Sequence, residues 1–194
     1  MQEIASAGVI LYITIDQRNI PMPVKKIALL GNPVLRKKCQ PVKEIESAET
    51  RSCIADLRDT LAEFRNARGF GRGIAAPQIG ATRQLLYINF DYEGALINPR
   101  ITQRSKRTFT LWDDCFSFPD ILVKVERSYS IHVSFKDGEG TSRLLKASGA
   151  LSELLQHEID HLNGILAIDR AIESRHIILR SEFKKIQQQR TLTV

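Results

Sequence analysis

The sequence lacks the features of a membrane protein and of a disulfide-stabilised secreted domain. No apolar run in its 194 residues approaches the ~20 that a helix needs to cross a bilayer. Cysteine is scarce, and Cys39, Cys53 and Cys115 form neither a C-x-x-C pair nor a disulfide framework. We therefore expect a cytoplasmic protein without a membrane partner, in which Cys39 and Cys53 are free thiols packed as small hydrophobic residues.

Residues 1–23 also lack the signals of an exported or organellar protein. The apolar run at 8–15 follows no basic segment, Glu3 comes early, and the stretch holds one arginine, which argues against a secretory or mitochondrial address. Two interpretations stay open: translation starts at Met22, or the stretch forms an additional strand. Because no motif lies within it, we expect this extension to be dispensable.

Length and composition require only one domain. A chain of 21.9 kDa with 43% hydrophobic and 26% charged residues is typical of a globular protein with a full core. The net charge of +6 is compatible with an RNA partner, and we expect no binding to DNA.

The stretch from Gln156 to Gly164 has the pattern of a metal site on a helix. His157 and His161 stand four residues apart, so their imidazoles lie one helical turn apart on one face and can hold one divalent ion. Glu158 points away from the pair but toward the same half of the helix, where a carboxylate can act on water without being a ligand. Apolar residues at the helical period predict that this helix is buried: Leu151, Leu154, Leu155, Ile159 and Leu162. A glycine then supplies its left-handed stop.

Two further stretches make the pattern specific. One runs from Gly71 to Gly80 and the other from Asp113 to Pro119. Together with the histidine stretch they resemble the three motifs of the peptide deformylase family, in the family's order. The histidine motif agrees throughout, the glycine motif has one departure, and the cysteine motif has three. Looser similarity extends over about 24–170.

The resemblance implies an α+β fold with antiparallel β-sheets packed around a central metal-binding helix and a helix at the C-terminus. It places the catalytic domain at 24–170, a basic C-terminal helix or tail at 171–194, and an extension at 1–23. Residue patterns point the same way. They predict an extended entry over 24–40, a helix over 48–67, strands at 84–90, 95–99 (closed by its proline), 101–111, 121–125, 129–135 and 142–146, and a helix over 173–190.

The resemblance also implies a ligand set. Cys115 becomes the third metal ligand beside His157 and His161, which leaves the fourth position open for chemistry. The family is known for Fe²⁺, whereas a thiolate with two imidazoles also suits Zn²⁺. The expected cofactor is therefore one Fe²⁺ per chain, with Zn²⁺ as the alternative.

The implied reaction removes the N-formyl group from the N-terminal methionine of a nascent polypeptide and releases formate. Glu158 is expected to accept a proton from the attacking water and return it to the leaving amine. The Gln78 amide and the backbone N–H of Phe116 are expected to stabilise the oxyanion. The expected substrate-binding residues are Arg72, Gly73, Ile74, Asp114 and Leu154.

Other functions compete with this one. They are a related hydrolase acting on another N-formyl or N-acyl substrate, a zinc-dependent peptidase, and a metal-retaining protein without catalysis. Zinc peptidases with this helix use histidine or a carboxylate as third ligand, and not a cysteine such as Cys115. A binding protein has no use for Glu158 beside an open metal position, so the non-catalytic alternative has least support.

The departures from the family pattern surround the expected catalytic centre. Arg72 replaces an apolar residue, and Asp113, Asp114 and Phe116 replace Glu, Gly and Leu. In the family, the positions of Arg72 and Asp114 flank the peptide channel. We predict that Arg72 pairs with Asp114 or Asp113 within ~4 Å, which narrows the channel and makes it more polar than a methionine pocket. The alternative is two solvated charges at the rim.

The C-terminal segment is basic and amphipathic in pattern. Such a run is usually a solvated helix face, but bacterial deformylases use a basic C-terminal helix to visit the ribosome. We therefore expect weak, salt-dependent ribosome binding through this helix.

Overall fold

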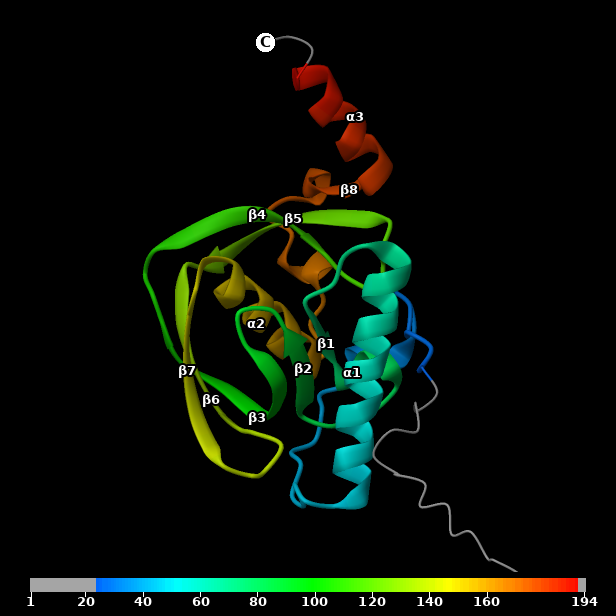
Figure 1. Ribbon diagram of the computed structural model, residues 1–194. Helices are drawn as coiled ribbons and strands as arrows, with labels where there is room; N and C mark the ends of the chain where they lie inside the picture. The colour runs from blue at the N-terminus through cyan, green and yellow to red at the C-terminus, as the bar shows by residue number, and fades with distance from the viewer. Residues whose placement is uncertain (1–23, 192–194) are drawn as a thin grey trace, which may run out of the picture.

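The computed structural model describes residues 24–191, and of 186–191 the backbone alone. The expected extension at 1–23, with both interpretations of it, lies outside these residues. Two antiparallel sheets surround one helix, a second helix packs outside, and a third stands at the C-terminal end (Figure 1). This arrangement confirms the α+β class. Among the described residues, no helix combines the length and the apolar character that a membrane crossing requires.

Both sheets are antiparallel throughout. The larger has the order β1 (Gly73–Ala75), β2 (Leu85–Asn89), β3 (Glu93–Arg104), β6 (Ser130–Lys136) and β7 (Ser142–Ser148). The smaller has the order β4 (Thr108–Asp114), β5 (Ile121–Ser128) and β8 (Ile177–Leu179). Short 3-10 turns lie at Pro33–Arg36, Ala76–Ile79, Ala167–Arg170 and Ser174–His176. Strand β1 is an edge strand, so one side of its main chain is not paired within the sheet.

Helix α2 (Gly149–Leu162) occupies the centre of the molecule (Figure 1). Every residue from Leu151 to Leu162 is buried, and its predicted apolar positions pack in one core cluster with β2, β3 and β6. Gly164 ends this region with φ +73, as predicted, and a Cβ there would lie 2.5 Å from the Arg36 carbonyl oxygen. Glycine is therefore required both by the backbone conformation and by the neighbouring turn.

Helix α1 (Ala48–Arg68) covers β1 and β2 from outside and agrees with the predicted helix. It begins at Ser47, whose hydroxyl accepts a hydrogen bond from Thr50 N–H at 3.2 Å. Gly69, with φ +75, ends it. Leu57 and Leu61 pack into the second core cluster beneath it. Cys53 lies in that cluster and Cys39 in the first, which confirms both as buried free thiols.

The prediction that a strand ends at Pro99 is wrong. Strand β3 continues to Arg104 through an irregularity between Ile97 and Arg100. Asn98 adopts φ +52 there, and its side-chain amide forms two 2.8 Å hydrogen bonds with the backbone of Val42. A proline is tolerated at a bulge because no ladder N–H is needed. The strand predicted over 101–111 is accordingly divided between β3 and β4, and the extended entry turns at residues 30–31 and continues into a 3-10 turn, Pro33–Arg36.

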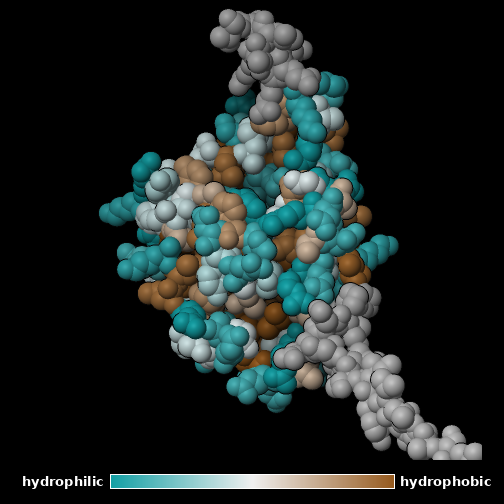
Figure 2. Space-filling view, in the orientation of Figure 1, coloured by the Kyte–Doolittle hydropathy of each residue, from teal (hydrophilic) through white to brown (hydrophobic). Residues whose placement is uncertain are grey.

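The predicted continuous helix over 173–190 is also wrong in its first part. A 3-10 turn and β8 precede α3 (Arg180–Thr191). Ile177 and Ile178 pair with Val123 and Leu122 of β5, a setting that favours β-branched residues. Helix α3 projects from the body of the molecule (Figure 1). The face of the whole molecule that Figure 2 shows is mainly hydrophilic, with apolar residues between the hydrophilic ones.

Candidate metal centre

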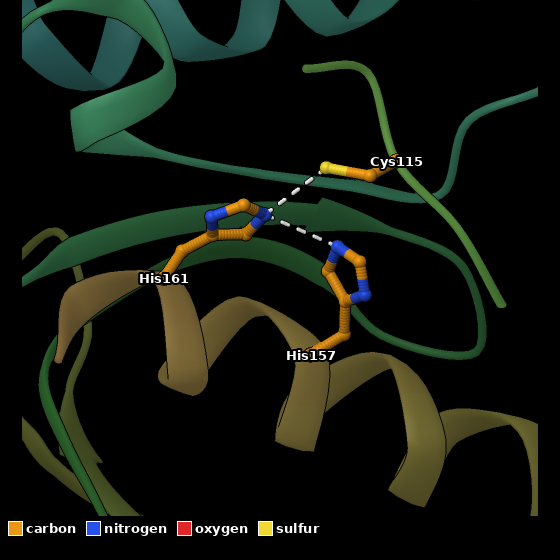
Figure 3. A group of neighbouring side chains, drawn as sticks. All are labelled: Cys115, His157 and His161. Carbon is orange, nitrogen blue, oxygen red and sulfur yellow. Dashed lines mark hydrogen bonds between the residues drawn. The ribbon is translucent and has the colours of Figure 1, made fainter. Parts of the chain in front are cut away.

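Three buried side chains converge beside α2. His157 and His161 come from one face of the helix, and Cys115 follows β4 (Figure 3). The Nε2 of His161 is 3.2 Å from Cys115 Sγ and 3.2 Å from His157 Nε2. In a tetrahedral site with metal–nitrogen bonds of ~2.05 Å and a metal–sulfur bond of ~2.3 Å, ligand atoms stand about 3.3–3.6 Å apart. The two nitrogens and the sulfur are therefore spaced for one ion.

A buried charge network orients His157. An Asp113 carboxylate oxygen lies 3.0 Å from His157 Nδ1, which directs Nε2 toward the other two donors. Arg127 bonds Asp113 at 3.2 Å and Asp160 at 2.5 Å. Burial by itself raises the pKa of Asp113, but His157 and Arg127 outweigh it and hold that pKa below its ordinary value. Asp113 is therefore a buried carboxylate that supports a candidate ligand at the wall of the cavity.

Glu158 lines the same cavity as Cys115 and His157. Its side chain is buried, and Oε2 has no hydrogen-bond partner within the described part of the chain. Burial raises the pKa of Glu158 to about 7. A Cβ on Gly73 would lie 2.9 Å from Glu158 Oε1, so the second glycine of its motif provides the space that the carboxylate occupies.

Gln78 presents its amide nitrogen to the same centre. Its Oε1 accepts a hydrogen bond from Ala75 N–H at 2.9 Å, which fixes the side chain. The Nε2 then lies 3.6 Å from Cys115 Sγ and 3.5 Å from Ser117 Oγ. The donor N–H groups of Gln78 therefore face the triad.

Phe116 is buried in the core and also belongs to the lining of the cavity at this centre. The ring stacks on Phe64 at a centroid distance of 3.8 Å. A Cβ on Gly71 would lie 2.6 Å from the Phe116 ring, and Gly71 has φ +132. The larger residue at 116 is therefore accommodated by the first glycine of the glycine motif, and the departure from leucine changes the packing under the site.

A cavity of about 460 Å³ opens at this centre. Its lining includes Gly73 and Leu154, both expected near substrate, together with Cys115, His157 and Glu158. The side chain of Ile74 is fully buried in the core cluster under α1 and is not part of the lining, so the expected contact of Ile74 with substrate would come from its main chain on the edge strand β1.

The predicted pairing of Arg72 with Asp113 or Asp114 is wrong. Arg72, the residue before β1, reaches across the cavity to α2, where its Nη2 bonds Glu153 Oε2 at 2.6 Å. Asp113 is already held by His157 and Arg127. The choice follows from burial: Glu153 is a carboxylate inside the molecule and needs a cation more than a half-exposed aspartate does.

Asp114 pairs instead with the C-terminal segment. Arg180 Nη2 lies 2.8 Å from Asp114 Oδ2, and Arg180 Nε bonds the Pro119 carbonyl at 2.9 Å. The same guanidinium lies 4.6 Å from the centroid of Phe70. Phe70 and Asp114 both line the cavity, so Arg180 joins two parts of its wall.

Sequence reasoning missed Glu153, Arg127 and Arg180. A signal existed for Glu153, because Glu153, His157 and His161 repeat at four-residue spacing on one helical face. No local pattern marks Arg127 or Arg180, whose partners lie on other elements.

Comparison with known proteins identifies the family. The family model for polypeptide deformylase matches residues 24–176. The chain belongs to the polypeptide deformylase family. Over 175 residues it is 34% identical to the peptide deformylase of Brucella suis biovar 1 (strain 1330), covering 87% of this chain and 97% of that protein.

Solved structures agree. A peptide deformylase from Synechococcus elongatus in complex with actinonin has a TM-score of 0.73 and 32% identity, covering 88% of this chain and 90% of that one. A Met-Ala-Ser-bound peptide deformylase from Acinetobacter baumannii has a TM-score of 0.70 and 29% identity, covering 78% and 99%. As a member of this metal-dependent family, the chain is an enzyme that removes the N-formyl group from nascent peptides.

Proposed function

We propose that residues 24–170 form a catalytic domain that deformylates the N-terminal methionine of nascent polypeptides in the cytoplasm and releases formate. The observation that carries the assignment of roles is the buried Glu158, whose Oε2 has no hydrogen-bond partner among the described residues, in one cavity with Cys115 and His157 and beside the third candidate ligand, His161. The Met-Ala-Ser peptide bound to the Acinetobacter baumannii relative supports methionine as the first residue.

Cys115, His157 and His161 would hold the metal. All three donor atoms lie within 4.8 Å of one another, and all three residues are buried. We propose Fe²⁺, with Zn²⁺ as the alternative, because thiolate and imidazole suit both. Such an ion supplies Lewis acidity, which polarises a carbonyl and makes water a nucleophile at neutral pH.

The residues of the chain divide the remaining work. Glu158 accepts a proton from the attacking water and passes it to the leaving amine, and a pKa of about 7 suits both roles. The Gln78 amide and the Phe116 N–H donate hydrogen bonds to the oxygen on which negative charge develops. Gly73 lies on the edge strand, where an extended peptide can pair with the main chain, and Leu154 offers apolar contact.

The direct test is formate release from formyl-Met-Ala-Ser by protein loaded with Fe²⁺ and kept from air, with Zn²⁺-loaded protein in parallel. We expect formate with Fe²⁺ loading, and no metal retention by Cys115→Ala. Absence of formate from properly metallated protein would overturn the proposed substrate, and unchanged metal content in Cys115→Ala would overturn the ligand set.

We further propose that α3 and its approach bind the ribosome. The exposed basic residues Arg175, Lys184 and Lys185 support this, as does the projection of α3 from the body (Figure 1). The test is co-sedimentation with ribosomes as a function of salt. Replacing these three residues by Gln should weaken binding.

A matched control removes the same charge elsewhere, at exposed Lys37, Lys38 and Lys106. Equal losses in the two triple variants would show that only net charge matters. Salt-independent binding would contradict the proposal.

A further inference from the structure

An ion pair crosses the cavity next to the candidate metal centre. Arg72 Nη2 lies 2.6 Å from Glu153 Oε2, and the side chains are 34% and 3% exposed. The guanidinium also lies 3.4 Å from the Ala150 carbonyl and 5.3 Å from the Phe90 ring centroid. The buried carboxylate is thus fixed on α2, and a partly exposed cation reaches it from the residue that precedes β1.

The pair lies within reach of a substrate's first side chain. Glu153 is one helical turn before His157 on the same face, and Glu153 and Arg72 line the same cavity as Cys115, His157 and Glu158. In an N-formyl peptide the Cα is two bonds from the formyl carbon. The first side chain of the peptide therefore starts close to the reacting group, and an unbranched side chain can enter the part of the cavity that Arg72 and Glu153 line.

The chemistry of the pair favours a polar side chain. An apolar group packed against a buried carboxylate and a guanidinium removes water from both and returns no hydrogen bond. A carboxamide can accept from Arg72 and donate to Glu153 at once. Methionine and glutamine have nearly the same length and shape. The difference in binding between peptides that begin with one or the other therefore isolates the effect of side-chain polarity.

We propose that Arg72 and Glu153 determine side-chain specificity, and that N-formyl peptides whose first side chain is unbranched and ends in an amide bind at least as well as formyl-methionyl peptides. This inference rests on the proposed deformylase function and deepens it. It assigns a selective role to two residues, one of which departs from the family pattern.

The decisive variant replaces both charges with methionine, as R72M/E153M. Replacing a buried ion pair by apolar residues of similar volume is often tolerated, whereas removing one partner leaves an uncompensated charge. R72Q/E153Q is a second variant that keeps hydrogen bonding without charge. E49Q/R83Q is the control, because it removes an exposed ion pair between Glu49 and Arg83, 2.5 Å apart, that lies outside the cavity lining.

Two measurements are made on each protein. Calorimetry with Zn²⁺-loaded protein gives the Kd of the product peptides Met-Ala-Ser and Gln-Ala-Ser, and formate release gives kcat/KM for the formylated peptides. For the wild type we expect both the affinity and kcat/KM to be equal or higher for the Gln peptide than for the Met peptide, which is a Gln-to-Met ratio of about one or higher. In R72M/E153M the Gln-to-Met ratio should fall at least tenfold. In R72Q/E153Q and in the control the ratio should stay at the wild-type value.

A wild-type preference for methionine above tenfold, or the same ratio in R72M/E153M, would overturn the inference even if one variant failed to fold. Failure of the proposed function looks different: neither formylated peptide yields formate, while the product peptides still bind with the expected ratio.

Discussion

At the scale of single residues, two predicted catalytic groups and one predicted metal ligand are each positioned by a neighbour that does not itself react. Gly73 leaves room for Glu158, Ala75 N–H fixes Gln78, and Asp113 orients His157. The reactive side chains thus lose little conformational freedom during a reaction, which is the benefit of preorganisation.

Replacing Glu158 by Gln should abolish turnover and keep the metal. The amide matches the carboxylate in shape but cannot accept and return a proton, so kcat/KM for formyl-Met-Ala-Ser should fall at least ~100-fold. Metal content by atomic absorption should match the wild type, because Glu158 is not one of the three converging donors. Near-normal formate release by this variant would remove Glu158 from the mechanism.

Replacing Asp113 by Asn should weaken metal binding. The amide can still meet His157 Nδ1, but it no longer carries the charge that makes the imidazole a better ligand, and Arg127 loses a partner. Loss of such a supporting carboxylate typically costs 10–100-fold in metal affinity, measurable by chelator competition with Zn²⁺. Asp59→Asn, at a surface pair with Arg58, is the control, and equal affinity in all three proteins would refute the role.

At the scale of elements, the C-terminal segment helps to build the cavity wall. Arg180, at the start of α3, bonds Asp114 of β4 and lies over the ring of Phe70. The ring of Phe183 packs against Trp112 with the ring centroids 5.2 Å apart. Deleting this segment to test ribosome binding would therefore also disturb the cavity. Charge substitutions on exposed residues separate the two effects.

Replacing Arg180 by Ala should raise KM more than it lowers kcat. The variant loses a partly exposed ion pair and a cation–π contact, each worth about 1 kcal/mol or less, so the free energy of unfolding should fall by about 1–2 kcal/mol. Urea denaturation and peptide kinetics test this. Arg175→Ala removes a surface pair with Glu173 and is the control, and the prediction fails if both variants show the same KM.

At the scale of the whole molecule, the two structural cysteines make the free energy of unfolding decrease at high pH. Burial raises the pKa of the Cys39 and Cys53 thiols from 9.0 to about 11. Between these values the unfolded chain releases protons that the folded chain retains. Their contribution to stability is therefore complete below pH 9 and is lost as the pH rises toward about 11.

The urea midpoint should thus fall from pH 8 to pH 10.5, and the fall should be smaller in Cys53→Ala. At pH 8 the thiolate fraction of a buried thiol should be about 100-fold below that of an ordinary one. Thiol-specific labelling of Cys39 and Cys53 should therefore be slow in the native protein and fast in urea. Rapid native labelling of either residue would contradict this account.

The sequence predicted best where the signal is local and periodic. The buried helix α2 was predicted correctly from its apolar spacing and its terminal glycine, and α1 from the same kind of pattern. Strand ends were predicted less well, because Pro99 normally stops a strand but lies here at a bulge whose shape depends on the Asn98 contact with Val42. Residues 177–179 became a strand because β5 offers an edge that no local pattern shows.

By itself, the sequence determined the family, the α+β class, and the helix that carries His157 and His161, because a four-residue spacing on a helix sets their geometry directly. Only the tertiary structure decided which charges pair. Arg72 meets Glu153, 81 residues away, and Asp114 meets Arg180, 66 residues away. Partners at such separations are selected by burial and by the packing of separate elements, since a carboxylate withdrawn from water must take the cation that the fold brings to it.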